Sequence, residues 1–110
     1  MPELTRPSTL QRNDVADVTD AAYTVANGIG VVKATKTASG TLNITLPPVA
    51  GNLGRKIYFW LTAISGGGKY TIVDAGDDSE WVDIDLDGAG DRCFLEGNGL
   101  AWITLFSELS

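Results

Sequence analysis

The chain has no histidine, one cysteine and no long apolar run in its 110 residues. Without histidine it cannot build a Ser-His-Asp or Cys-His catalytic group or a histidine-ligated metal site. Its single cysteine, Cys93, permits no internal disulfide and favours a reducing compartment. The longest uncharged, largely apolar run, residues 57–64, falls far below the ~20 residues that a membrane helix needs, and residues 1–4 do not begin a signal peptide. We therefore expect no membrane partner.

Basic residues are also scarce, because eight Lys and Arg stand against 14 Asp and Glu, for a net charge of −6. An acidic surface repels a phosphate backbone, so we expect no nucleic-acid partner. The remaining composition, 44% hydrophobic and 20% charged, is that of a globular protein, and 110 residues suffice for one domain.

What the chain does contain is a series of short alternating segments separated by turn signals. In residues 41–46, Leu42, Ile44 and Leu46 share one face, and the prolines that follow end the strand. Similar segments recur, with turn residues about every 8–12 positions and no sustained helical period. This pattern predicts an all-β fold: a small antiparallel β-sandwich or jelly-roll-like barrel with an extended N-terminal arm.

Residues 1–20 differ from the rest of the chain. They contain two prolines and no periodic apolar face, and residues 13–20 predict at most one helical turn or a loop. We therefore divide the chain into an N-terminal arm, residues 1–20, and a β-sandwich domain, residues 21–110. An arm of this kind becomes ordered by lying on a partner. Its candidate anchors to that partner are Arg6, Leu10 and Arg12.

The longest predicted strand, residues 55–64, has two apolar faces. The face that alternates with the core positions carries Tyr58, Trp60, Thr62 and Ile64. A chain of this size does not easily bury both faces of a strand. We therefore predict a homotrimer, with Tyr58, Trp60 and Ile64 at the trimer interface.

Acidic residues are concentrated between positions 74 and 96, where nine of the 14 lie and Arg92 is the only base. Residues 83–88 match the first half of an EF-hand loop, but position 12 of that loop would be Phe94 instead of a bidentate glutamate. Alternate aspartates of a strand also lie about 6.6 Å apart, too far to share one ion. We therefore expect a strand on a solvated acidic face and no metal, with Ca²⁺ binding as the alternative.

Other residues that could carry chemistry lack the neighbours that such chemistry needs. No two carboxylates are set apart by an apolar pocket that would raise one pKa, as glycoside hydrolysis requires. Cys93 has no activating neighbour and is expected in the core, and residues 66–68 lack the Lys-Ser/Thr of a phosphate loop. We expect no catalytic residue, no cofactor and no small-molecule substrate. Strand aromatics favour a core or an interface, with a sugar-stacking platform as the alternative for four of them: Tyr58, Trp60, Trp81 and Trp102.

The stretch from Leu42 to Leu105 resembles a module common in tailed-phage structural proteins, which occurs in head decoration proteins and in tail-fibre and spike tips. The resemblance rests on an ordered series: an alternating strand ending in Leu-Pro, a Gly-Arg strand start, several short strands and a terminal Gly-x-x-Trp strand. In this chain these segments are residues 41–47, 54–57, 70–72, 83–86, 91–95 and 99–103. The resemblance implies a trimeric β-module on a virion.

The chain has room for this module and a short arm but not for a fibre shaft, so we expect the head and not the tail. The predicted function is that of a non-enzymatic decoration (cement) protein on the outer capsid surface of the virion, made in the host cytoplasm. It would bind as a homotrimer and stabilise contacts between copies of the major capsid protein. One alternative is a trimeric tail-fibre or spike tip that binds a host surface glycan, and another is a Ca²⁺-dependent adhesion module of a cell.

Overall fold

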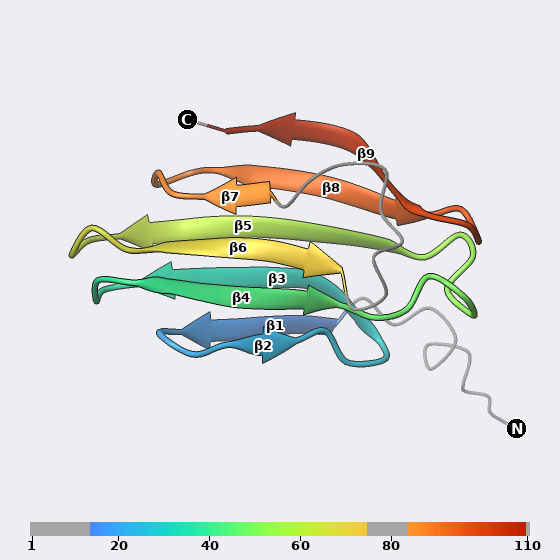
Figure 1. Cartoon of the computed structure of the whole chain (residues 1–110), viewed down its shortest axis with the longest axis horizontal. Coiled ribbons are helices and arrows are strands. Elements are labelled where there is room, and N and C mark those ends of the chain that lie inside the picture. The colour runs from blue at the N-terminus through green and yellow to red at the C-terminus, as the bar shows by residue number, and fades with distance from the viewer. Residues whose placement is uncertain (1–13, 75–83, 110) are drawn as a thin grey trace, which may run out of the picture.

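Two β-sheets lie face to face and make up the fold (Figure 1). The computed structural model describes residues 14–74 and 84–109, and within these ranges it contains strands and no helix. The all-β prediction is therefore confirmed. The strands are β1 (Asp14–Thr19), β2 (Tyr23–Thr24), β3 (Ile29–Lys36), β4 (Thr41–Leu46), β5 (Lys56–Ile64), β6 (Lys69–Asp74), β7 (Ile84–Leu86), β8 (Arg92–Gly97) and β9 (Trp102–Glu108).

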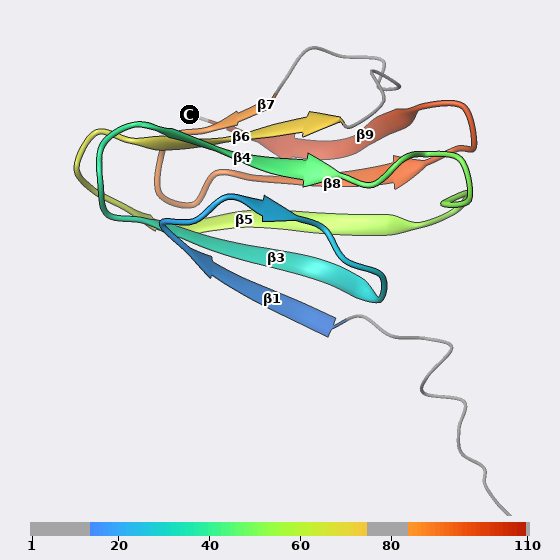
Figure 2. The same cartoon turned by 60° about the horizontal axis from the view of Figure 1, so that its bottom comes forward.

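The strands form sheet A, in the order β1-β3-β5-β8-β9, and sheet B, in the order β2-β4-β6-β7. From β1 to β6 the chain crosses to the other sheet after every strand (Figure 2). Neighbours among these strands are consequently parallel, as in the β1–β3 and β3–β5 pairs of sheet A and the β2–β4 and β4–β6 pairs of sheet B. The β5–β8, β6–β7 and β8–β9 pairs are antiparallel.

The predicted antiparallel arrangement is therefore wrong for the strands of the first half of the chain. A turn signal marks where the chain reverses, but it does not tell whether the next strand pairs with the previous one or enters the facing sheet. Here each early reversal leads into the facing sheet, so two reversals separate neighbouring strands and make them parallel. Both sheets are also open at their edges and do not close into a barrel, which leaves a two-layer, sandwich-like domain.

The core fills the space between the sheets with alternate residues of their strands, most regularly in β3, where every second residue is buried. Tyr70 brings a hydroxyl into this core, where it donates to Ala21 O (3.0 Å) and accepts from Ala21 N (3.1 Å). Trp102 Nε1 donates to Pro47 O (2.9 Å), so both buried aromatic residues have satisfied polar groups. Cys93 is buried, as predicted, and burial raises the pKa of its thiol to about 12.

Strand β1 belongs to the β domain, although the sequence placed residues 13–20 in the arm as a helical turn or loop. It pairs with β3, and Val18 and Ala16 point toward the core. Two small apolar positions in alternation are enough for an edge strand once a neighbouring strand supplies the hydrogen bonds. The domain thus includes residues 14–20. The proposed anchors of the arm, Arg6, Leu10 and Arg12, lie outside the described residues.

A β-bulge in β5 separates Ile64 from the face that carries Tyr58 and Trp60. Ala34 of β3 pairs with Leu61 and the next residue, Thr35, pairs with Ala63, so Thr62 is the extra residue. The bulge shifts the alternation by one position, and Ile64 packs against the core. The predicted grouping of Ile64 with Tyr58 and Trp60 is therefore wrong, because strict alternation does not continue through a bulge.

Candidate functional site

A row of apolar side chains crosses all five strands of sheet A on its outer face. Residues paired in register point to the same side of a sheet, and each residue of this row is paired with the next. Along β1, β3, β5 and β8 the row alternates with core residues, so it faces away from sheet B, and pairing with Phe94 places Phe106 of β9 on the same side. We call it the apolar row; from β1 to β9 it consists of Val15, Val31, Tyr58, Phe94 and Phe106.

The apolar row is accessible from outside the domain. Val15 and Phe106, at its two ends, are 52% and 49% exposed, and the residues between them are half-buried. The rings of Tyr58 and Phe94 meet edge to face, with centroids 6.2 Å apart and planes at 69°. Monomeric proteins rarely leave a contiguous apolar strip across a whole sheet, and such strips mark interaction sites.

Charged residues border the apolar row on both sides. One neighbouring row, which we call the charged row, runs from β1 to β9 through Asp17, Lys33, Trp60, Arg92 and Glu108. Arg92 donates to Glu108, and this bond raises the pKa of the Arg92 guanidinium. On the other side Lys56 Nζ lies 3.5 Å from Glu96 Oε2. An apolar centre with a charged border is the usual anatomy of a protein–protein interface.

Trp60 is the exception within the charged row, because it places a large aromatic ring between two cations. It is 37% exposed, and its register partners are Lys33 on β3 and Arg92 on β8. A tryptophan face beside hydrogen-bonding cations is suited to a protein contact or to stacking on a sugar ring.

The outer face of sheet B is polar by comparison. Its central row consists of Asn43, Thr71 and Asp85, which are paired in register across β4, β6 and β7. Asp85 accepts hydrogen bonds from Lys69 Nζ (3.0 Å) and Thr71 Oγ1 (2.9 Å), and both bonds lower the pKa of its carboxyl. This face has the composition of a solvated sheet surface. The candidate binding face is therefore that of sheet A.

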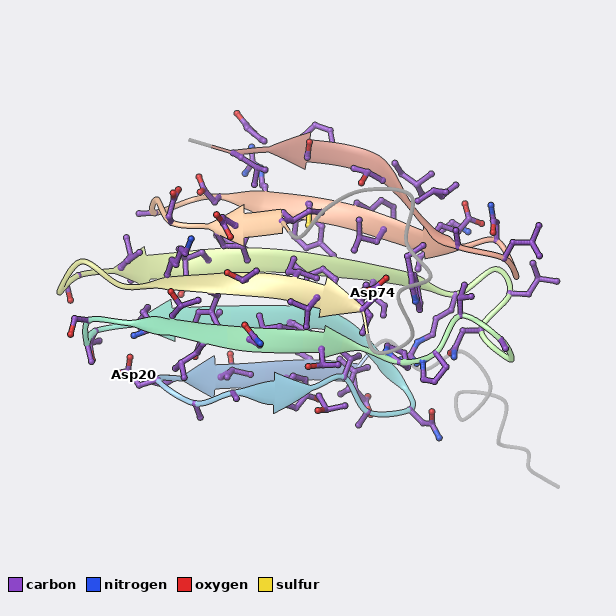
Figure 3. All side chains as sticks on the ribbon, in the orientation of Figure 1. Asp20 and Asp74 are labelled. Atoms are coloured by element: carbon purple, nitrogen blue, oxygen red, sulfur yellow. The ribbon has the colours of Figure 1, made fainter. Side chains whose placement is uncertain are left out.

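An ion pair between the buried Lys36 and the half-buried Asp20 lies at one end of the strands and serves the fold. Lys36 at the end of β3 is 1% exposed, and its Nζ donates to Ala38 O (2.5 Å) and Ser39 O (3.2 Å) and lies 3.8 Å from Asp20 Oδ1. Figure 3 labels Asp20 at this end of the strands. Asp20 also accepts hydrogen bonds from the hydroxyl and amide of Thr37, which lower the pKa of its carboxyl. The hydrogen bonds of the Lys36 ammonium group therefore go to the β3–β4 turn, which they stabilise.

The structure brings some of the predicted site residues together and separates others. Tyr58 and Trp60 lie on the candidate face, whereas Trp102 is in the core and Trp81 lies outside the described residues. Sequence reasoning missed four members of the apolar row: Val15, Val31, Phe94 and Phe106. Phe94 does show a signal, because it is a large apolar residue that alternates with the core residues Cys93 and Leu95, whereas Phe106 has exposed neighbours in β9.

The acidic stretch forms no metal site in the part of the chain that the structure describes, where no three possible ligands cluster. Residues 84–86 form β7, so the strand interpretation of this segment is confirmed, and Asp85 points outward to Lys69. Asp83 lies outside the described residues.

Within the described ranges, no helix has the length and hydropathy needed to cross a bilayer.

Comparisons of the chain with protein-family models, with curated proteins and with solved structures gave no match.

Proposed function

We propose that this chain is a non-enzymatic structural protein that assembles as a homotrimer through the outer face of sheet A. The apolar row is the observation that carries this proposal. It offers three aromatic and two aliphatic side chains to a neighbour, and aromatic side chains are enriched at the centres of interfaces. Lys56–Glu96 and Arg92–Glu108 border the row and would form the polar rim.

The apolar row supports association of moderate strength. Complete burial of one large apolar side chain contributes about 1.5–3 kcal/mol, and these five are already half-buried, so covering them contributes roughly 5 kcal/mol. Association itself costs about 4–15 kcal/mol in lost freedom of motion. Rim contacts and a second neighbour in a closed trimer add to the row. Assembly is therefore expected at micromolar concentrations or on a larger scaffold.

The scaffold that we propose is the head of a tailed phage, where the trimer acts as a decoration protein bound to the major capsid protein on the outer surface. This follows the sequence resemblance, which implies a trimeric virion module. A protein that binds only the assembled shell stabilises the shell by mass action. A net charge of −6 suits an outer surface, because attraction to the packaged DNA is not needed there.

The proposal is tested by the number of copies of the chain in purified virions and by the effect of the apolar row on assembly. Hundreds of copies per particle are expected, together with a trimer in sedimentation equilibrium that V15S/F106S converts to a monomer. At dilutions where the wild type is also monomeric, the melting temperatures of the two proteins should be equal. Leu109→Ser is the matched control, since Leu109 is 44% exposed but lies outside the row. A wild-type monomer both in solution and on heads would refute the proposal.

A second candidate function is supported by Trp60 alone. Its exposed ring between Lys33 and Arg92 favours a fibre or spike tip that stacks on a host glycan. Such a protein would be present in a handful of copies per virion. Trp60→Ala would then abolish binding to host cells, whereas a decoration protein would keep its normal copy number on the head.

A further inference from the structure

Two leucines on neighbouring loops are exposed at one end of the domain. Leu53 is 75% exposed and Leu100 is 85% exposed, the highest values among the large apolar side chains of the described residues. Leu53 lies over the β8–β9 hairpin: its Cδ1 is 3.3 Å from the place that a Cβ on Gly99 would take. We call this pair the leucine tip. Because both side chains face solvent, folding gains little from them.

Hydrogen bonds hold both loops of the leucine tip in place. Asn98 Oδ1 accepts from the amides of Leu100 (2.9 Å) and Ala101 (2.8 Å), which fixes the hairpin. Gly54 N donates to Gly97 O (2.7 Å), which joins the two loops to each other. Apolar groups displayed on a preorganised support lose little freedom when they bind, so the leucine tip has the properties of a docking element.

The leucine tip lies at the end of the domain where residues 1–13 join β1. Arg55 is the last residue of the β4–β5 loop, which carries Leu53. It donates to Ala26 O (2.7 Å) in the β2–β3 connection and to Ile29 O (2.9 Å) at the start of β3. Gly28 of the same connection accepts from Asp14 N (3.1 Å), the first described amide. Figure 1 shows the start of β1 at the same end as the β4–β5 loop and the β8–β9 hairpin. A partner that binds the leucine tip would therefore lie at the end of the domain where β1 begins.

We propose that the leucine tip is the end of the domain that faces the head, and that its two leucines enter an apolar concavity on the outer surface of the major capsid protein. This inference rests on the proposed decoration function and adds to it the surface that binds the shell. The apolar row would then join subunits, and the leucine tip would attach them to the capsid.

The shape and charge of the domain favour this occupant over two others. A second copy is disfavoured because a hollow at the opposite end of the strands offers the two leucines one large apolar residue, Ile64, beside glycines and Thr41, Ser65, Lys69 and Asp87. A membrane is disfavoured because the chain carries a net charge of −6, and the nearby Lys56 is paired with Glu96. The occupant favoured by these observations is a protein whose surface has an apolar concavity complementary to the two leucines.

The test uses the full-length wild type, L53S/L100S and, as matched control, Leu109→Ser at the other end of the strands. Each protein is mixed with undecorated heads of the phage, the heads are sedimented, and bound protein is quantified against concentration. We expect the affinity of L53S/L100S to fall at least tenfold while that of Leu109→Ser is unchanged. All three should have the same melting temperature and the same oligomeric state.

Each other outcome overturns the inference in a recognisable way. If the wild type and L53S/L100S decorate heads equally, the leucine tip is not the capsid contact and the decoration function stands. If the wild type does not bind heads, the decoration function and this inference both fail. If L53S/L100S changes the oligomer, the leucine tip is a subunit contact. If the wild type but not L53S/L100S binds vesicles of phosphatidylcholine and phosphatidylglycerol, the leucine tip binds lipid.

Discussion

The two outer faces of this domain are built on the same alternation but carry different side chains. On sheet A, aromatic and aliphatic residues such as Tyr58 and Phe94 are paired in register across the strands. On sheet B the corresponding positions carry Asn43, Thr71 and Asp85. Both sheets already bury their inner faces against each other. The comparison therefore separates residues that fold the domain from residues that are available for contact with another molecule.

Composition alone does not reveal this difference, because each strand shows only its own alternation. Strand β4 of sheet B alternates apolar and polar residues, as expected for a sheet with one solvated face, whereas β5 of sheet A carries apolar residues on both faces. The register then adds one outward residue of every strand to a continuous row. A continuous row of five apolar side chains is large enough to form an interface with a partner, whereas a single exposed aromatic residue is not.

The largest effect is expected from placing a charge in the apolar row. Tyr58→Asp would put an unpaired carboxylate into the subunit contact, which costs roughly 3 kcal/mol and weakens trimer association about 100-fold. Sedimentation equilibrium over a range of concentrations measures this effect. Thr45→Asp on the outer face of sheet B is the matched control and should leave association unchanged. Equal effects of the two changes would show that the faces are equivalent in assembly.

A second variant separates loss of contact from loss of folding. Phe106→Asp changes an end of the row that is 49% exposed, so at dilutions where both proteins are monomeric the domain should melt at nearly the wild-type temperature. It should still weaken the trimer clearly. A trimer as strong as that of the wild type would place the subunit contact elsewhere on the domain.

The comparison also shows how much the sequence could predict. Inward residues such as Leu42, Ile44 and Leu46 were identified because the alternation that marks them is local. The partners of Tyr58 were not identified, because the register between β5 and β8 depends on two segments that are far apart in the chain. Strand direction was missed for a related reason, since turn residues do not specify which sheet the chain enters next.

Two further differences come from features that leave no mark in one sequence. The bulge at Thr62 shifts the alternation of β5, and no glycine or other turn residue in this part of the sequence indicates it. Strand β1 is stabilised by its pairing with β3 more than by its own composition. Of the candidate site, Tyr58 and Trp60 were predicted because both are large aromatic residues in a strand with two apolar faces.

A smaller effect is expected from a change in the core between the two sheets, where Tyr70 of sheet B reaches the β1–β2 connection. Tyr70→Phe removes two hydrogen bonds to Ala21 and leaves both backbone groups of Ala21 without this partner. We expect a loss of roughly 2 kcal/mol in the free energy of unfolding, measured by denaturant titration. Tyr23→Phe, at a half-buried position of β2, is the control. An unchanged stability in Tyr70→Phe would mean that water replaces these bonds.

The smallest effect concerns the polar row of sheet B. Hydrogen bonds from Lys69 and Thr71 hold the pKa of Asp85 below the ordinary value of an aspartate. A carboxyl with a lower pKa in the folded state contributes stability above the unfolded pKa, and this contribution disappears as pH falls through the folded pKa. Asp85→Asn should therefore destabilise the domain at pH 7 by less than about 1 kcal/mol, because the pair is exposed. In chemical denaturation, the difference from the wild type should shrink progressively as pH falls below the unfolded pKa of an aspartate. Assembly should be the same for both proteins at pH 7, because Asp85 lies on the outer face of sheet B and the apolar row lies on that of sheet A. A trimer weakened by Asp85→Asn would assign the outer face of sheet B to the interface and reverse the comparison.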